Sequence, residues 1–174
     1  DGIRDLVRSR GLGDVYKRQA HFRAPLSRHG LIPGIRRLLS RLRKETGTET
    51  VLQNQANDAE LTEEEEAQIL RIVQEALANV RKHSRANMVR VLLSYDNIGR
   101  LRLIVEDDGV GMIIAPDDQD SDGHFGLAIM QERAGTVGAE LTIESEPGDG
   151  TRVAIQLGSA DKATAKTPLG ERTE

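Results

Sequence analysis

The chain has 174 residues, of which 37% are hydrophobic and 30% charged, and its formal net charge is −4. This composition excludes full-length disorder and is typical of one domain with a core of moderate size. The absence of cysteine excludes disulfide bonds, thiolate metal sites and a cysteine nucleophile. Two Phe, two Tyr and no Trp argue against an aromatic platform for single-stranded nucleic acid. No apolar run approaches the ~18–20 residues that a membrane-spanning helix needs.

Charge is divided unevenly along the chain. Residues 1–50 carry 12 Lys and Arg against 5 Asp and Glu, whereas residues 51–174 carry 12 against 23. One interpretation is a basic connecting segment before an acidic globular domain, and another is a basic arm for nucleic acid or a lipid surface. The acidic body favours the first interpretation, and we expect no nucleic acid partner.

The first part of the chain is expected to contain a leader, a helix and a short strand. Residues 1–19 show no clean hydrophobic period, so we predict a non-native or disordered leader there. Residues 31–44 place Leu and Ile at helical spacing with Arg on the opposite face, which predicts a helix. Pro33 suits its first turn and Gly47 its end. A short strand is expected near residues 50–53.

A second helix is predicted to begin at Thr62, which Glu65 follows three residues later in a capping-box pattern. Its apolar stripe contains Ile69, Ile72, Val73, Ala76 and Val80. At about 100° per residue, a polar stripe falls beside the apolar one. The polar stripe consists of Glu75, Asn79, Lys82 and His83.

The rest of the domain is predicted to form strands and one more helix. Residues 87–95 and 100–106 flank a turn signal and predict a hairpin. A helix is expected from about 126 to 136, followed by a second hairpin of residues 139–145 and 151–157. Hairpins beside a layer of helices predict an α+β sandwich rather than a doubly wound sheet.

The polar stripe of the second helix is a candidate site. Glu75 and Asn79 lie one turn apart and supply carboxylate and amide oxygens, which are ligands that Mg²⁺ prefers. Glu75 could also orient or deprotonate an attacking group, and Lys82 or His83 could reach phosphate oxygens. The alternative is a solvated polar helix edge.

The string DDGVG contains Asp107, Gly109 and Gly111 and follows an apolar strand. Glycines there permit a tight turn and a close approach between backbone and ligand. A carboxylate at a strand end can accept a hydrogen bond from the amino group of adenine. The alternative is an ordinary acidic turn, and the spacing matches neither a P-loop nor a dinucleotide-binding fingerprint.

Two further motifs precede the last helix and the last strand. Gly123, His124, Gly126 and Leu127 stand at the start of the predicted helix. Backbone N–H groups at a helix N-terminus bind phosphate well, although a glycine-containing helix start needs no ligand. Thr151 ends the string GDGT, which by itself is typical of a hairpin turn. Each motif is weak alone, and their order along the chain makes the combination specific.

From about Leu61 to Leu157 this order resembles the ATP-binding domain shared by sensor histidine kinases, gyrase, Hsp90 and MutL. The strings IVQEALANVRKHS, VEDDGVGM and HFGLAIMQERA are similar to those of the nitrate/nitrite sensor-like subgroup of histidine kinases. The resemblance implies a Bergerat-type two-layer α/β sandwich, with a mixed, mostly antiparallel sheet and helices on one face. It implies an ATPase domain at 48–158, preceded at 20–47 by the end of a dimerisation helix region and a connecting helix. A disordered tail is expected at 159–174.

The resemblance also implies roles for the candidates on the second helix and the following strand. Asn79 matches the Mg²⁺ ligand, and Glu75 matches the catalytic acid and is a second candidate ligand. Lys82 and His83 match positions near the phosphates. The adenine-reading residue is matched by Asp107.

The glycine motifs receive roles from the same resemblance. Gly109 and Gly111 match the loop beside the adenine-reading residue. The segment that hinges a lid and meets the phosphates is matched by Gly123, His124, Gly126 and Leu127, with residues 112–123 as the lid. Thr151 matches a threonine near the adenine pocket.

The activity that the resemblance implies is Mg²⁺-dependent transfer of the ATP γ-phosphoryl group to a histidine, for relay to a response regulator. Neither His21 nor His29 stands in the sequence context of the family's acceptor, so we expect the acceptor on a dimerisation helix outside this chain. That helical hairpin would also form a homodimer. The domain would be the cytoplasmic part of a protein anchored in the bacterial inner membrane.

Three alternatives remain for the function. They are a non-catalytic nucleotide-binding regulatory module, an ATPase of the gyrase or MutL type, and a plain interaction domain. Binding and turnover of ATP discriminate among them.

Overall fold

The computed structural model describes residues 30–111 and 122–158, with the side chains of 122–125 excepted. The predictions for residues 1–29, for residues 112–121 of the expected lid at 112–123 and for the tail at 159–174 lie outside the described residues. Residues 122 and 123, the end of the expected lid, belong to a helix.

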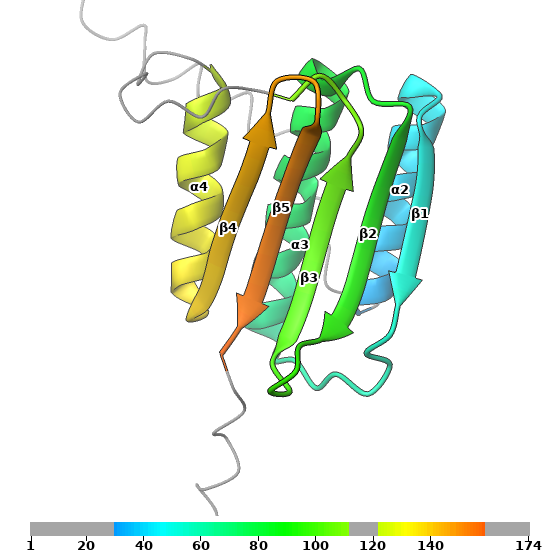
Figure 1. Ribbon diagram of the computed structural model, residues 1–174. Helices are drawn as coiled ribbons and strands as arrows, with labels where there is room; N and C mark the ends of the chain where they lie inside the picture. Colours follow the sequence, from blue (N-terminus) through cyan, green and yellow to red (C-terminus); the bar gives the residue numbers. More distant parts are fainter. Residues whose placement is uncertain (1–29, 112–121, 159–174) are drawn as a thin grey trace, which may run out of the picture.

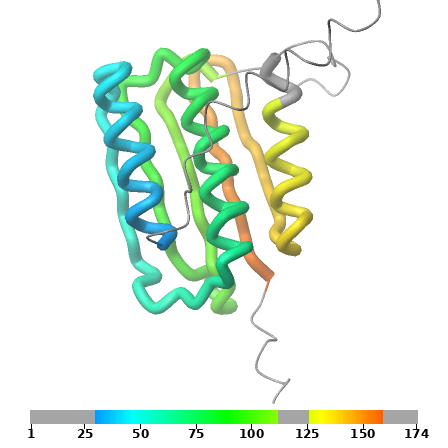
Figure 2. Tube along the Cα trace, turned by 180° about the vertical axis from the view of Figure 1, so that it is seen from behind, coloured from blue at the N-terminus to red at the C-terminus, as the bar shows by residue number. Residues whose placement is uncertain are grey.

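Five strands form one sheet, and the helices cover one of its faces (Figures 1 and 2). The strand order is β1-β2-β3-β5-β4, in which β1 pairs with β2 in parallel and the other neighbours are antiparallel. The predicted two-layer α+β sandwich is therefore confirmed. The elements are α2 (Leu31–Thr46), β1 (Glu49–Asn54), α3 (Glu63–Asn79), the π-helical turn η2 (Val80–Ser84), β2 (Met88–Tyr95), β3 (Leu101–Asp107), α4 (Asp122–Thr136), β4 (Ala139–Glu146) and β5 (Gly150–Leu157).

The N-terminus of α3 is fixed by the predicted capping box. The Thr62 hydroxyl accepts a hydrogen bond from the Glu65 backbone N–H at 3.2 Å, and the Glu65 carboxylate accepts one from the Thr62 N–H at 2.7 Å. Two backbone donors that the first helical turn leaves free are thereby satisfied. The capped helix then presents its apolar stripe to the sheet.

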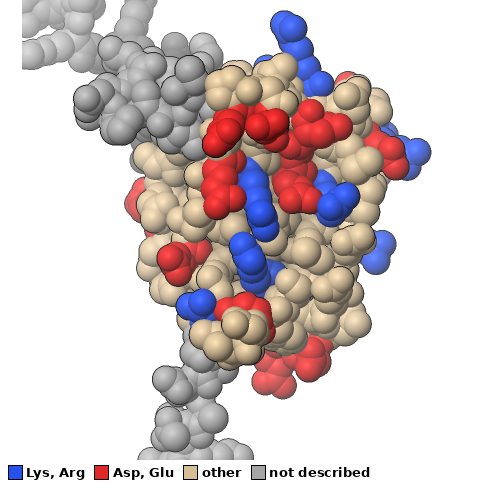
Figure 3. Space-filling model, in the orientation of Figure 1, with Lys and Arg blue, Asp and Glu red and all other residues tan. Residues whose placement is uncertain are grey.

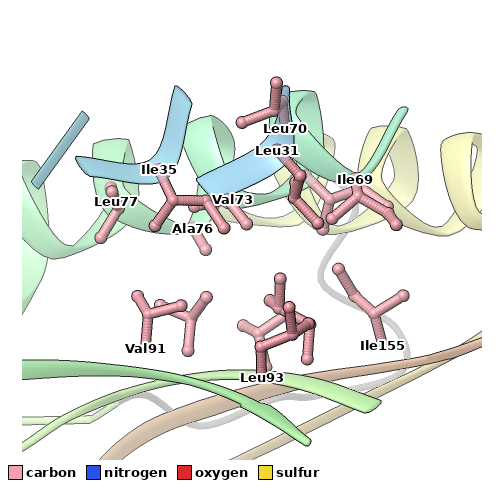
Figure 4. Packing of buried hydrophobic residues seen from close by; sticks show 14 of the residues in the cluster. Leu31, Ile35, Ile69, Leu70, Val73, Ala76, Leu77, Val91, Leu93 and Ile155 are labelled. Atoms are coloured by element: carbon pink, nitrogen blue, oxygen red, sulfur yellow. The ribbon is translucent and has the colours of Figure 1, made fainter. Parts of the chain in front are cut away.

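The core lies between the sheet and the helices (Figure 4). Because successive strand side chains point to opposite faces, every second residue of a strand enters this layer. Val91, Leu93 and Ile155 point from the sheet towards the helices, where Ile35 and Val73 meet them. All five are at most 2% exposed. Full burial of each such side chain stabilises the fold by about 1.5–3 kcal/mol.

Two helices differ from those predicted. The polar stripe to His83 assumes regular helical spacing, but the regular α-helix ends at Asn79 and continues as a π-helical turn, in which the Ser84 hydroxyl donates to the Val80 carbonyl oxygen at 3.0 Å. The turn ends at Arg85, whose φ of 51° lies in the left-handed region. In addition, α4 begins at Asp122 rather than near Gly126. Gly126 thus lies inside the helix, where glycine lowers helix stability by only about 1 kcal/mol relative to alanine, and it does not mark a helix start.

The face of the sheet that the helices leave uncovered is charged (Figure 3). The strand register places Arg90, Glu106, Arg152 and Glu144 in one row of alternating sign. Arg90 and Glu106 form an ion pair at 2.9 Å with side chains 45% and 36% exposed. Such an exposed pair contributes about 0–1 kcal/mol, so this row keeps the face solvated more than it stabilises the fold. None of the helices in the described ranges has the length and apolar character that a membrane crossing requires.

Two helical glycines provide a matched test of the α2–α3 contact. A Cβ on Gly34 would lie 2.6 Å from the Leu70 side chain, which is fully buried, whereas a Cβ on Gly135 meets nothing within 4 Å. Gly34→Ala is therefore expected to lower the free energy of unfolding by about 1–3 kcal/mol. Gly135→Ala is expected to leave it unchanged or raise it by up to about 1 kcal/mol. Urea denaturation measures both, and stabilisation by Gly34→Ala would contradict the packing described.

Candidate functional site

A pocket lies at the end of the sheet where β3 ends and β5 begins. These two strand ends are at the top of Figure 1. The end of α3, the turn η2 and the helix α4 close it from the other layer. The residues that line it are Ala76, Asn79, Val80, His83, Ser84, Val105, Asp107, Gly111, Leu127, Met130, Thr151 and Val153. The pocket therefore gathers residues from four stretches of sequence: 76–84, 105–111, 127–130 and 151–153.

The chemistry of the lining suits a flat, mostly apolar ligand with a polar edge. Val105 and Val153 supply apolar surface from neighbouring strands, and Met130 supplies it from α4. Asp107 and Thr151 are directly paired in the register of β3 and β5, so one carboxylate and one hydroxyl stand side by side at the sheet edge. Apolar walls with a few convergent polar groups are typical of small-molecule sites.

Asp107 is half-buried, and its burial raises the pKa of the carboxyl above its ordinary value. The backbone N–H of Gly109 donates to Asp107 Oδ1 at 2.9 Å and opposes that rise in pKa. The negative charge of Asp108 adds a smaller upward contribution to the pKa. The carboxylate is thus held in place by the loop that follows it, while its partial desolvation strengthens any hydrogen bond that it accepts from a ligand.

Asp108 points elsewhere, because adjacent residues at a strand end project to opposite sides. Its Oδ1 accepts hydrogen bonds from the backbone N–H groups of Asn87 and Met88, both at 2.8 Å. These bonds tie the loop after β3 to the start of β2. Of the two consecutive aspartates, only Asp107 lines the pocket, and Asp108 has a structural role.

The glycines of the DDGVG string stand where backbone segments approach closely. A Cβ on Gly109 would lie 2.2 Å from the Ser84 carbonyl oxygen. Gly111 has a φ of +65°, and a Cβ there would lie 2.0 Å from the Glu146 carbonyl oxygen. The loop between them is held by two hydrogen bonds, from Val110 N–H to the Ser84 carbonyl oxygen at 2.7 Å and from Gly148 N–H to the Val110 carbonyl oxygen at 2.8 Å. Backbone segments therefore approach one another so closely at this edge of the pocket that no side chain fits at position 109 or 111.

The polar residues of α3 and η2 are only partly brought together. Asn79 and His83 line the pocket. Glu75 does not line it, but its carboxylate oxygen would lie 2.7 Å from a Cβ on Gly126, and the Asn79 amide nitrogen 3.7 Å from that atom. Lys82 is exposed and does not line the pocket, because the π-helical turn changes the regular spacing on which its expected position rests.

The glycine motif before the last helix lies inside α4, not in front of it. Gly123 and His124 belong to the first turn of the helix, and their side chains lie outside the described residues. Gly126 is buried against Glu75 and Asn79, and Leu127 lines the pocket. Within the described residues no group of three or more His, Cys, Asp or Glu side chains is placed to hold a metal ion.

Several lining residues were not singled out from the sequence. Ser84, Val105 and Val153 reach the pocket through strand register and the π-helical turn, for which a single sequence carries no signal. Met130 falls within the helix expected at about 126–136, but an apolar residue in a helix can be either a core residue or part of a pocket wall.

The family of histidine kinase-, DNA gyrase B- and HSP90-like ATPases matches residues 64–161, a range that contains the described pocket. The chain belongs to this ATPase family. The nitrate/nitrite sensor protein NarQ of Escherichia coli is 29% identical to this chain over 157 residues, which cover 88% of this chain and 27% of NarQ. The histidine-protein kinase/phosphatase UhpB of Salmonella typhimurium is 35% identical over 157 residues, 90% of the chain and 29% of UhpB.

A solved structure shows the same fold. The histidine kinase domain of the blue-light activated histidine kinase of Erythrobacter litoralis is 28% identical, with a TM-score of 0.60 over 74% of this chain and 60% of that one. The ATPase-family chain spans under a third of the length of NarQ and UhpB. The similarity to these sensor kinases places this chain in the histidine kinase branch of the ATPase family.

The two consecutive aspartates of the ATPase-family chain should respond differently to substitution. Asp108→Ala removes the acceptor of two backbone N–H groups, so the free energy of unfolding at pH 7 should fall by about 1–3 kcal/mol. Asp107→Asn keeps an acceptor for Gly109 N–H and removes a partly desolvated charge, so stability at pH 7 should be unchanged or higher.

The stability difference between Asp107→Asn and wild type depends on pH through proton linkage. Because the pKa of Asp107 is higher in the folded than in the unfolded chain, its contribution to stability falls as the pH rises through the folded pKa. The advantage of Asp107→Asn over wild type should therefore shrink when the pH falls below about 4. Urea denaturation at both pH values measures this difference. A loss of stability at pH 7 as large as that of Asp108→Ala would contradict the assignment.

Proposed function

We propose that the chain is the ATP-binding catalytic domain of a two-component sensor histidine kinase, which transfers the ATP γ-phosphoryl group to a histidine. The observation that carries the proposal is the pocket edge, where the half-buried Asp107 carboxylate and the Thr151 hydroxyl are paired above apolar walls. The similarity to sensor kinases supports the reaction class.

The adenine base would lie between the apolar walls with its amino group towards Asp107. A charged acceptor binds an amino group but repels a carbonyl oxygen, which guanine carries at the equivalent position. Asp107 would therefore select adenine over guanine, and Thr151 would contact the same edge of the base. Gly109 and Gly111 would let the backbone approach the base closely.

The phosphates would extend from the base towards α3 and the start of α4. Asn79 would hold a Mg²⁺ ion through its amide oxygen, with Glu75 as a second candidate ligand across Gly126. Few protein ligands are needed, because Mg²⁺ keeps several waters and phosphate oxygens in its shell. His83, and Lys82 when its flexible side chain turns inward, would contact phosphate oxygens. The N-terminal part of α4, with Gly123, His124, Gly126 and Leu127, would meet the same groups.

In the transfer, an imidazole nitrogen forms a bond to the γ-phosphorus while the bond from that phosphorus to the β–γ bridging oxygen breaks and ADP leaves. The transition state is loose, so the domain contributes positioning and charge neutralisation. A Mg²⁺ ion held by Asn79 would supply neutralisation of the charge on the phosphate oxygens. Glu75 would orient the attacking imidazole and take up its proton.

The acceptor histidine and the receiving partner lie outside the described residues in this proposal. We place the acceptor on a helical hairpin that also forms a homodimer, and we expect an aspartate of a response regulator to receive the phosphoryl group. The domain would work in the cytoplasm as part of a protein anchored in the inner membrane. The similarity to a nitrate/nitrite sensor makes that subgroup the first candidate for the parent protein.

Calorimetric titration of the chain with Mg-ATP and Mg-GTP tests the proposal. Wild type should bind ATP in preference to GTP, and Asp107→Asn should weaken ATP binding about tenfold or more, since a hydrogen bond to a charged group is lost. Asp108→Asn is the matched control, because it changes the neighbouring carboxylate in the same way outside the pocket lining. Its affinity should stay within about twofold of wild type. No binding of ATP to folded wild type, or equal losses in both variants, would contradict the proposal.

A further inference from the structure

Three residues form one row across three strands at the edge of the pocket. The register pairs Asp107 of β3 with Thr151 of β5, and Thr151 with Ser145 of β4. Asp107 and Thr151 line the pocket, whereas Ser145 stands behind Thr151 and does not. Ser145 is half-buried and was not among the residues singled out from the sequence.

The hydroxyl protons of this row can be assigned from the hydrogen bonds. Ser145 Oγ lies 2.9 Å from the Gly150 carbonyl oxygen, which can only accept, so Ser145 donates its proton there. Ser145 Oγ also lies 2.9 Å from Thr151 Oγ1. Because a hydroxyl has a single proton, the bond between the two side chains requires Thr151 to donate. The proton of Thr151 is thus directed away from the pocket, and its remaining lone pairs are left for a ligand.

We propose that Ser145 is a positioning residue that fixes the Thr151 hydroxyl as an acceptor and so sharpens the preference of the pocket for a 6-aminopurine over a 6-oxopurine. This inference rests on the proposed function, because it assumes that the base lies against Asp107 and Thr151. With Thr151 fixed, both polar groups at that edge are acceptors. An amino group satisfies them directly or through water, whereas a carbonyl oxygen meets two acceptors and no donor.

Removal of the Ser145 hydroxyl frees the Thr151 proton. The threonine hydroxyl can then rotate and donate to a 6-carbonyl oxygen. A 6-oxopurine thereby gains a hydrogen-bond donor that the wild-type pocket does not offer. The ratio of the two affinities reports this rotation. A general loosening of β4 would weaken both ligands alike, because they differ only at the polar edge of the base.

The test is a calorimetric comparison of Mg-ATP with Mg-ITP, which carries a carbonyl group at position 6 and lacks the 2-amino group of guanine. Wild type should prefer ATP, and Ser145→Ala should reduce the ATP-to-ITP affinity ratio about fivefold to tenfold, as expected for one neutral hydrogen bond. Ser145→Thr retains a hydroxyl and should restore the wild-type ratio. Thr142→Ala removes an exposed hydroxyl from the same strand and should leave the ratio unchanged.

A double-mutant cycle separates action through Thr151 from other effects. In a Thr151→Ala background, Ser145→Ala should produce no further change in the ratio. If wild type prefers ATP but Ser145→Ala leaves the ratio unaltered, or if the change persists in the Thr151→Ala background, this inference fails while the proposed function stands. If folded wild type does not bind ATP, the proposed function fails and this inference with it.

Discussion

The antiparallel pairing of β3 with β5 is the contact on which the rest of the site depends. These strands are separated in sequence by the segment at 112–121, α4 and β4, yet they lie side by side at the centre of the sheet. Their pairing places Asp107 next to Thr151 and brings α4 over the same edge. Because β4 then pairs with β5, a third residue of the row, Ser145, reaches Thr151 from behind. Without that register, the pocket has neither its polar edge nor its apolar walls.

Backbone contacts hold the Asp107 carboxylate at this edge. The loop after β3 is bound on one side to Ser84 at the end of the π-helical turn and on the other to the β4–β5 turn at Gly148. Asp108 adds a third attachment, to the start of β2. Three attachments fix a charge that burial disfavours, and such a preorganised group loses little freedom when a ligand binds. The same constraint explains why glycine occupies the closest approaches along the loop.

Local patterns predicted the elements well, because each carries its own signal. The capping box at Thr62 and Glu65 and the apolar stripe of α3 predicted a helix that the structure contains. Asp107 could be chosen as a candidate because it ends an apolar strand and precedes glycines. The π-helical turn could not be predicted, since no local pattern marks it; its last residue, Ser84, accepts a hydrogen bond from the distant Val110 N–H. The expected position of Lys82 on the polar stripe was based on regular helical spacing and changed with that turn.

Residues behind the pocket lining could not be predicted from the sequence for a similar reason. Ser145 cannot be distinguished from any other strand residue until the register of β4 with β5 is known. Resemblance to the family supplied roles for the glycine motifs. It did not predict that Gly126 of α4 packs against Glu75 and Asn79 of α3. Long-range pairing thus decided which of the polar residues meet, while the local pattern decided only which were available.

A crystal structure of the chain with Mg²⁺ and a non-hydrolysable ATP analogue would test the assignment of the pocket directly. We expect the adenine amino group about 3 Å from the Asp107 carboxylate, with the metal ion on the Asn79 amide oxygen. A nucleotide bound with its base away from Asp107, for example on the uncovered charged face of the sheet, would contradict it.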